Sequence, residues 1–428
     1  MSFKIEKNRI KEDRSRSAVL WGRVLSCALI VYIAYGLAIY WFKLTFVIPD
    51  GINYWQFTEW LINYEGGFVR RGLLGEMLYW FCSHTGIGPR YIISFASIAI
   101  YLSLFYFFFK KFRDRGLCWW FLAAPFMFGF CYSVIRKDFL LLWLFISTLM
   151  LLKSENPSVW RRIASGLLMI LALFLHEAYI FFGVPVILLL LADGKRKWLF
   201  AVTVASVVST FILMSVNHGS REIVDSINES WNLLSGRDML VYNPENSIGA
   251  LEWECVHTFN RHLRRNIDYQ YYCIGLFLRP VAMFFAYYLI VNFLKVFSHK
   301  DTRYNSADQT NIGAVYILLT LCMFPMWTVL SCDYLRLYQY ICMCTIGTFL
   351  VLDRKRIAGI FPQSCLRYVS RLNRVIDRGL PGSKGWLLVV FLLWWPDPSF
   401  YYFTEALQES IAGKLSVLFG SLVKYICF

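Results

Sequence analysis

Charged residues are scarce in this sequence. Asp, Glu, Lys and Arg make up 17% of its 428 residues, whereas 58% are hydrophobic and 18% are aromatic. An ordinary soluble domain has about 25% charged and about 45–50% apolar residues, so the composition favours a membrane protein over a water-soluble fold. The formal net charge of +15 comes from Lys and Arg in short clusters between apolar runs, which is typical of cytoplasmic loops in membrane proteins and does not indicate nucleic acid.

Metal-binding motifs are also missing. The sequence has 12 Cys but no CxxC pair, and most of its Cys lie in apolar stretches. At most one disulfide is expected, among Cys82, Cys255, Cys273 and Cys332. No pair of acids has metal-ligand spacing, and His176-Glu177 lacks the second His of a zinc-protease helix. We therefore assign no metal and no cofactor.

A cleavable signal peptide is not indicated either, because the first apolar run is far longer than a signal-peptide core and no cleavage site follows it. Taking about 20 residues per crossing, the apolar runs predict an all-α polytopic membrane protein with about eleven or twelve transmembrane helices. Its predicted spans are Ala18–Ile48, Tyr91–Phe109, Leu117–Tyr132, Phe139–Leu152, Ile163–Leu175, Tyr179–Leu191, Trp198–Val216, Tyr272–Val296, Asn311–Leu330, Leu337–Leu352 and Trp386–Trp395.

The basic clusters fix the predicted orientation of this single integral membrane domain, residues 1–428. Six Lys and Arg precede the first span, so the N-terminus is expected in the cytoplasm. Alternation then makes 49–90 an external loop with interfacial helices, 217–270 a large external loop, and 354–384 a basic cytoplasmic loop. The tail 403–428 is amphipathic, and either a twelfth span or an interfacial helix fits it.

In this topology the remaining ionisable residues gather near the external ends of the spans. They are Glu65, Arg70, Arg71, Arg136, Lys137, Asp138, His176, Glu177, Arg279, Asp333 and Arg336. The spans beside several of them are short, reaching only about 20 Å at ~1.5 Å per residue. Charges at that depth are costly unless they face water or one another, so we expect them to line a cavity open to the outside.

Each of these groups also has a purely structural interpretation. Arg136 and Lys137 could extend to lipid headgroups while Asp138 caps the following helix. His176-Glu177 could be a buried pair joining two helices, and Arg70-Arg71 could contact anionic lipid. Asp333 and Arg336 have the spacing of an i,i+3 ion pair.

The stretch from Asn63 to Gly75, NYEGGFVRRGLLG, is the most motif-like part of the chain. Its glycines permit tight turns and leave backbone amides free to approach a ligand. Two adjacent arginines offer forked donors suited to phosphate oxygens. This segment therefore predicts a pyrophosphate-binding loop.

The many spans, the Arg136-Lys137-Asp138 run before an apolar helix, the external His176-Glu177 and the external arginines together resemble the Wzy and EpsG-type polymerases of lipid-linked oligosaccharide repeat units. The acidic first external loop is more distantly similar to GT-C membrane glycosyltransferases. The resemblance covers the topology of the whole chain and residues 50–180 in motif terms. Residues 217–270 cannot be aligned with the large external loop of such enzymes.

The resemblance implies an O-antigen polymerase of the bacterial inner membrane, which joins undecaprenyl-pyrophosphate-linked repeat units at the external face. A chain-length regulator protein is a further implied partner. Cations must then stabilise the departing pyrophosphate, and a base must accept the proton of the attacking hydroxyl. The expected pyrophosphate ligands are Arg70, Arg71, Arg136, Lys137, Arg279 and Arg336, the expected bases are His176, Glu177 and Glu65, and Asp138 and Asp333 are expected elsewhere in the cavity.

Three other classes remain open. A GT-C glycosyltransferase using a polyprenyl-phosphate sugar would need similar groups, and a membrane O-acyltransferase of glycans could use His176 as its base. A secondary transporter would more often show matching Gly or Pro breaks in two halves, with charges near the midplane. Here the charges cluster on one side.

Reporter fusions test the predicted topology. Fusions in 110–116, 153–162, 193–197, 298–305 and 354–384 should report the cytoplasm, and fusions in 217–270 should report the exterior, because the Lys/Arg clusters alternate loop by loop. A cytoplasmic signal from 217–270 would remove the external cavity altogether.

Overall fold

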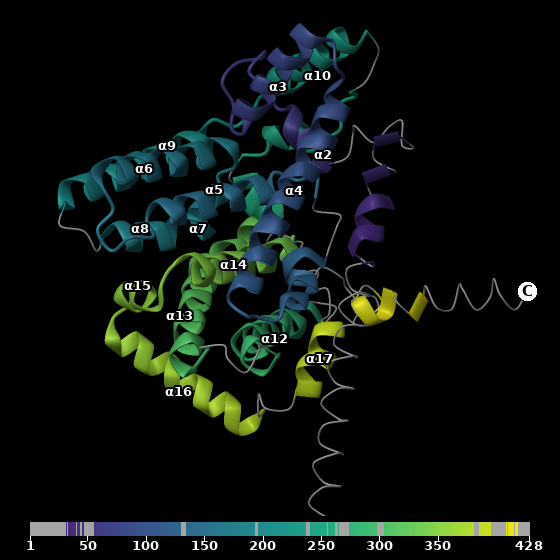
Figure 1. Cartoon of the computed structure of the whole chain (residues 1–428). Coiled ribbons are helices and arrows are strands. Elements are labelled where there is room, and N and C mark those ends of the chain that lie inside the picture. Colours follow the sequence, from purple (N-terminus) through teal and green to yellow (C-terminus); the bar gives the residue numbers. More distant parts are fainter. Residues whose placement is uncertain are drawn as a thin grey trace, which may run out of the picture.

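The computed structural model describes residues 55–129, 134–192, 196–236, 240–254, 256–261, 264, 274–297, 304–331, 333–380 and 385–394, with most of 31–46 and part of 408–417. Within these residues the regular elements are helices, without strands, as the sequence predicts. Figure 1 shows the helices arranged as a layered body, with α2, α3 and α10 grouped at one end and α15 and α16 at the other.

Among the residues that the structure describes, three helices are long and apolar enough to cross a membrane. They are α4 (Pro89–Asp114), α9 (Lys197–Val216) and the Arg279–Val296 part of α12 (Ile274–Phe297). α5 (Asp138–Leu151) is apolar but shorter. Pro280 lies inside α12 and has no N–H, so it cannot donate to the carbonyl of the residue four positions before it.

The central helix is α14 (Tyr334–Val351), in which every residue except Arg336 is buried. It packs against α4, α5, α7 (Tyr179–Phe182), α12 and α13 (Ser306–Cys322). α13 begins with a capping box, in which Asn305 and Asp308 exchange side-chain and backbone hydrogen bonds. Because α14 is buried at all positions but one, it needs apolar side chains around its whole circumference.

The remaining elements surround this core. α6 (Val159–Leu175) packs between α5 and α9, and α8 (Val184–Ala192) follows α7. The peripheral helices are α10 (Arg221–Ser235), α15 (Arg354–Gly359), α16 (Gln363–Gly379) and α17 (Gly385–Leu393).

Three predicted spans differ from a continuous α-helix. Tyr179–Leu191 is divided at Gly183 into α7 and α8. The range 117–132 contains the 3₁₀-helix η3 (Trp119–Ala123) and the π-helix η4 (Pro125–Gly129), because Pro125 has no N–H to continue the preceding turn. The range Asn311–Leu330 ends in a second π-helix, η7 (Met326–Leu330). Ala18–Ile48 and 403–428 lie largely outside the described residues.

The two segments predicted as external loops pack on each other. Residues 49–90 contribute α2 (Trp55–Leu61) and α3 (Gly72–Thr85), and 217–270 contribute α10 and the 3₁₀-helix η6 (Gly249–Glu252). Their apolar side chains form a second hydrophobic cluster. The Trp231 indole donates to the Leu61 carbonyl at 2.8 Å, so polar contacts also join the two segments.

Cys82 belongs to this second cluster and carries no disulfide. The other cysteines considered for a bridge, Cys255, Cys273 and Cys332, lie outside the described residues.

Gly75 tests the close approach between α2 and α3. A Cβ at this position would lie 1.8 Å from the Ile62 carbonyl oxygen, so Gly75→Ala should lower the free energy of unfolding by about 1–3 kcal/mol. The matched control is Gly359→Ala at the end of α15, where nothing lies within 4 Å of the added atom. Thermal unfolding of both purified variants should show a loss only for Gly75→Ala, and equal unfolding would contradict the packing described.

Candidate functional site

The layer formed by α2, α3, α10 and η6 is called the outer layer below. A cavity of about 660 Å³ lies between the outer layer and the helical core. Its walls come from α2, the turn before α3, the connection between α6 and α7, the end of α9, residues 245–261 and residues 326–336. Of the residues predicted from sequence, it is lined by Arg70, Arg71, Arg136, His176, Glu177, Asp333 and Arg336. The structure therefore brings together side chains that are far apart in sequence.

Arg71 and Glu177 form a two-pronged ion pair in the cavity wall. Arg71 Nε donates to Glu177 Oε2 at 2.8 Å, and the second guanidinium nitrogen donates to the other carboxylate oxygen. Each side chain is only 17% exposed. Burial alone would raise the pKa of Glu177, but the Arg71 charge, the hydrogen bond from Arg71 and the other nearby basic groups together outweigh burial and hold that pKa well below its usual range.

Arg71 has an unusual backbone conformation for a residue with a side chain. Its φ of 65° makes it the one non-glycine residue with positive φ in the described part of the chain. This left-handed conformation costs of order 1 kcal/mol and persists only where surrounding contacts hold it. Here the Glu177 pair holds the side chain, and Lys137 Nζ donates to the Arg71 carbonyl at 3.2 Å.

His176 lies behind this pair, with both ring nitrogens engaged. The Ala178 backbone N–H donates to Nδ1 at 3.1 Å, so Nδ1 is the acceptor and Nε2 carries the proton. Nε2 is 3.4 Å from a carboxylate oxygen of Glu59. Burial and then the Arg71 charge lower the pKa of His176 well below 6.5, so the ring is neutral.

Glu59 was not among the candidates drawn from the sequence. It lies in α2, is fully buried, and faces His176. No hydrogen bond to either carboxylate oxygen is found within the described residues. Its sequence signal was weak but present: Glu59 is a single acid among Trp55, Phe57 and Trp60, in a segment otherwise interpreted as an interfacial loop.

Asp138 and Arg336 form a second buried pair beneath the cavity. Arg336 Nε and Nη2 donate to the two Asp138 oxygens at 2.7 and 2.6 Å, and the Tyr340 hydroxyl also donates to Asp138. Asp138 is the first residue of α5, where its negative charge suits the N-terminal helix dipole. It therefore lies behind the cavity wall and not in the lining.

Asp333 connects two of the arginines that line the cavity, Arg136 and Arg336. Its carboxylate lies 3.1 Å from Arg136 Nη1 and 3.2 Å from Arg336 Nη1, the latter being the i,i+3 pair expected from the sequence. The Asp333 side chain is 42% exposed, more than any of the charged partners around it. This carboxylate is both paired and accessible from the cavity.

The outer rim comes from the long segment 245–261. Arg70 donates to the carbonyls of Ala250 and Trp253 at 3.1 and 3.3 Å, which ties this segment to the turn before α3. Arg261 lies over the Trp253 ring at 4.1 Å and pairs with Glu245. Arg261, Trp253 and Glu245 were not predicted as cavity residues, because they lie in a polar segment with no recognisable motif.

Besides Asp138, three further predicted residues lie outside the lining. Lys137 is fully buried behind Arg71, and burial lowers its pKa to about 8. Arg279 is buried in α12, with its guanidinium 3.7 Å from the Tyr334 ring centre. Glu65 is exposed in the turn before Gly66 and does not line the cavity.

Positive charge prevails in the lining. It contains five arginines, at 70, 71, 136, 261 and 336, against the three acids Glu177, Glu245 and Asp333. With His176 neutral, the difference is two positive charges. Arginine presents several donors in a fixed plane, so such a wall suits an anion with several oxygens, such as a phosphate or pyrophosphate.

Comparison of the sequence with protein-family models and with curated proteins, and of the fold with solved structures, found no match.

A double-mutant cycle tests the Arg71–Glu177 pair. Arg71→Met or Glu177→Met alone should lower the free energy of unfolding by about 3 kcal/mol or more, because each leaves a buried charge without its partner. The double variant should lose clearly less than the sum of the two, with a coupling of at least ~1 kcal/mol. The measurement is unfolding of the purified variants in detergent, and additive losses would show that the two side chains act independently.

Proposed function

We propose that this protein transfers a glycan from undecaprenyl pyrophosphate to a hydroxyl of a second lipid-linked unit, as a membrane polysaccharide polymerase. The observation that carries the proposal is the arginine-rich cavity, in which side chains from separate parts of the chain surround one space of about 660 Å³. A binding cavity of this size accommodates the reacting sugars and the pyrophosphate but not a long glycan, which would leave through the open side.

The arginines would bind the pyrophosphate leaving group. Arg71, Arg136 and Arg336 are each held by a carboxylate, so their guanidinium groups have fixed positions before any substrate binds. Preorganised cations of this kind stabilise charge that develops as a bond breaks, without having to rearrange. Lys137 is fully buried and would contribute its charge only from behind.

Asp333 is the best-placed base. Its carboxylate is accessible, and its neighbours Arg136 and Arg336 would place it beside the pyrophosphate, whereas the more exposed Glu245 lies at the rim and pairs with Arg261. His176 is less suitable, because one ring nitrogen accepts a backbone N–H and the other faces Glu59. Glu177 is bound by Arg71 through both oxygens, and its lowered pKa makes it a weak base.

The reaction would proceed in one balanced step. The acceptor hydroxyl oxygen forms a bond to the anomeric carbon of the donor, and its proton passes to Asp333. The bond from that carbon to the phosphate oxygen breaks, and the pyrophosphate leaves with the electron pair. The leaving pyrophosphate gains one negative charge while Asp333 loses one on protonation, and the arginines stabilise the charge on the leaving group.

A lipid-linked substrate requires the cavity to lie at a membrane surface. α4, α9 and α12 have the length and composition to cross a membrane, and all three lie in the body that supports the cavity. We propose that the cavity lies at the external face of the inner membrane. The basic segments predicted as cytoplasmic would then lie on the opposite side of the membrane.

The proposal predicts the effect of Asp333→Asn. Removing the base should slow transfer by about 100-fold or more with protein level close to wild type, because general-base catalysis typically contributes 10²–10⁴-fold. Since Asp333 also positions Arg136, the pH dependence of the rate is measured as well: loss of a base changes it, whereas a displaced arginine does not. The assay uses purified full-length protein in detergent with synthetic undecaprenyl-pyrophosphate repeat units, read as the distribution of chain lengths. His176→Gln measured alongside should retain more activity than Asp333→Asn.

The phosphate role is examined in the same assay with the triple variant Arg70→Lys, Arg71→Lys and Arg136→Lys. Lysine keeps the charge but loses the forked geometry, so chain length should fall. The matched control changes the exposed Arg113, Arg161 and Arg221 to Lys. Wild-type polymer from the cavity variant would overturn the phosphate role, and loss with His176→Gln but not Asp333→Asn would return the base to His176.

A further inference from the structure

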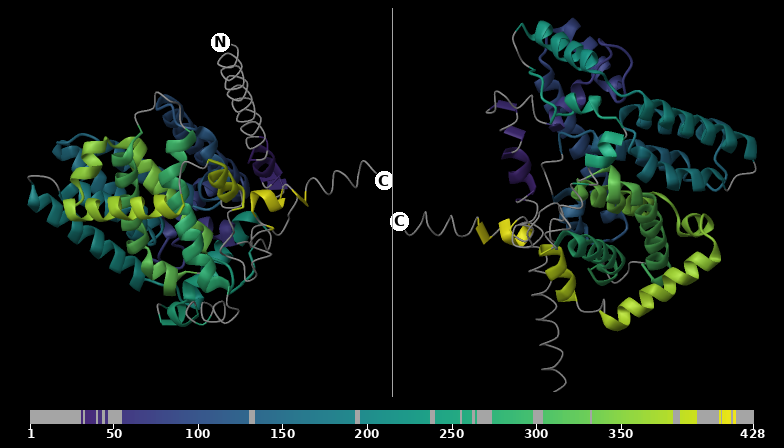
Figure 2. Two further views of the ribbon diagram at one scale, coloured as in Figure 1. Left: turned by 90° about the horizontal axis from the view of Figure 1, so that it is seen from below. Right: turned by 180° about the vertical axis from the view of Figure 1, so that it is seen from behind.

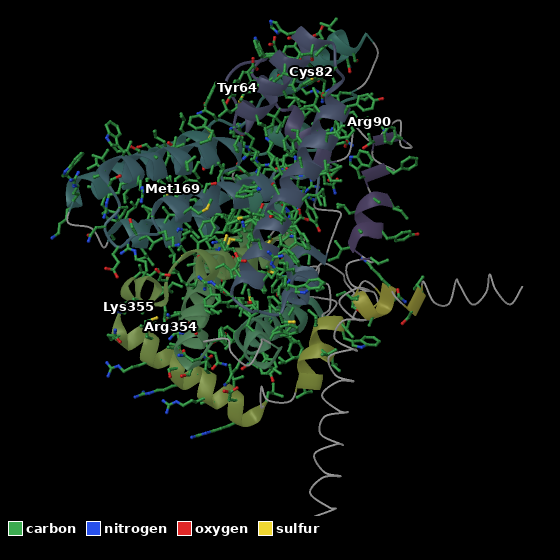
Figure 3. All side chains as sticks on the ribbon, in the orientation of Figure 1. Tyr64, Cys82, Arg90, Met169, Arg354 and Lys355 are labelled. Atoms are coloured by element: carbon green, nitrogen blue, oxygen red, sulfur yellow. The ribbon has the colours of Figure 1, made fainter. Side chains whose placement is uncertain are left out.

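α16 is a strongly amphipathic helix at the end of the molecule opposite the outer layer (Figures 1 and 2). Its four arginines, Arg367, Arg371, Arg374 and Arg378, follow one another at intervals of four, three and four residues. Residues at such spacing lie on one face of a helix, and all four side chains are exposed. Figure 3 shows the long nitrogen-tipped side chains of this helix projecting away from the body, with Arg354 and Lys355 near its start.

The opposite face fixes α16 on the helical core. Val369 is buried, and α16 packs along α13. The Tyr287 hydroxyl of α12 donates to the Asn373 side chain at 2.5 Å. The orientation of the helix is therefore set, and the arginine face points outward because the other face is held.

Apolar side chains lie exposed between these two faces. Tyr368 is 67% exposed and Val375 is 63% exposed, and both lie on the side of the helix next to the arginines. Exposure of these large apolar side chains to water would be unfavourable in free energy. A helix with a charged stripe bordered by exposed apolar groups is typical of the membrane interface, where each kind of side chain meets its own environment.

A separate apolar groove begins at the same helix. Its volume is about 260 Å³, and it is lined by Met283, Phe284 and Tyr287 of α12, Tyr316, Ile317, Thr320 and Leu321 of α13, and Leu372 and Ile376 of α16. Its hydroxyl groups donate within the protein: Tyr287 to Asn373, Tyr316 to Met283 and Thr320 to Tyr316. The groove therefore offers hydrocarbon surface to an occupant.

We propose that α16 and this groove bind one anionic phospholipid of the bilayer, with its phosphate on the arginine stripe and an acyl chain in the groove. The groove residue Leu372 lies about 100° around the helix from Arg371, and the exposed Val375 and Tyr368 lie between them, so the headgroup and chain sites border each other. The groove runs beside the Arg279–Val296 part of α12, which is apolar enough to lie in a membrane. With Asp377 as its one acid, α16 carries a net charge of +3, and this favours an anionic headgroup over a zwitterionic one.

The site lies outside the cavity, since the groove and the cavity share no lining residue. It does not depend on the proposed transferase activity. A nucleic acid would contact the arginines but would leave the groove and the exposed Tyr368 and Val375 unfilled. The paired charged and apolar surfaces therefore favour a lipid.

Native mass spectrometry of the purified full-length protein tests the proposal. Phosphatidylglycerol and phosphatidylcholine with the same acyl chains are titrated into the detergent solution, and bound lipid is counted. Wild type should bind one phosphatidylglycerol at least ~10-fold more tightly than phosphatidylcholine. Changing the four α16 arginines to Gln should abolish that preference, since each basic group near an anionic surface contributes several-fold in affinity.

Two variants act as controls. The matched charge control changes Lys110, Arg113, Arg161 and Lys197, exposed basic residues outside α16, to Gln and should retain the preference. Leu321→Trp places a large ring at the exposed side of the groove and should weaken phosphatidylglycerol binding without changing protein unfolding. Equal loss in the charge control, an unchanged affinity in Leu321→Trp, or tighter binding of a short RNA than of phosphatidylglycerol would each overturn the proposal.

Discussion

The ion pair between Asp138 and Arg336 is the contact on which the arrangement around the cavity depends. It joins the first residue of α5 to the first turn of α14, the helix buried on all its other positions. Tyr340 donates to the same carboxylate and stacks on Phe182 of α7 at 3.9 Å, so a third element is fixed by it. Two charges in the interior are stable only when geometry and further hydrogen bonds compensate for lost hydration, and here both are present.

The cavity charges form a supported set rather than isolated groups. Glu177 and Asp333 hold Arg71, Arg136 and Arg336 in place, while the surplus of arginine leaves the wall positive overall. The acids already hold these arginine side chains in position, so the arginines would have to move little when an anionic ligand binds. Glu59 is fully buried behind this wall and faces His176, which lines the cavity.

Much of the site follows from the sequence because ionisable residues beside short apolar segments have few stable environments. That reasoning found Arg71, His176, Glu177, Asp333 and Arg336. It did not find Glu59, because an acid in a segment of mixed polarity has no local signature of burial. It also placed Lys137 and Asp138 in the cavity, since hydropathy gives depth but not the direction in which a side chain points. The interruptions at Pro125 and Gly183 were missed for the same reason: apolar runs record composition, not the hydrogen-bond pattern within them.

The shared core of the outer layer has a consequence for the order of assembly. Its hydrogen bond from Trp231 to the Leu61 carbonyl joins residues that are 170 positions apart in the chain. At the usual elongation rate of about 5–20 residues per second, the first of these segments is complete roughly 10–30 s before the second is synthesised. Phe57, Trp60 and Leu61 therefore remain for that period without the part of the cluster that α10 and η6 supply, and the rim segment 245–261 is made after α4 to α9. Long-range contacts of this kind are slow to form, so biogenesis of the outer layer depends on protection of α2 and α3 in the meantime.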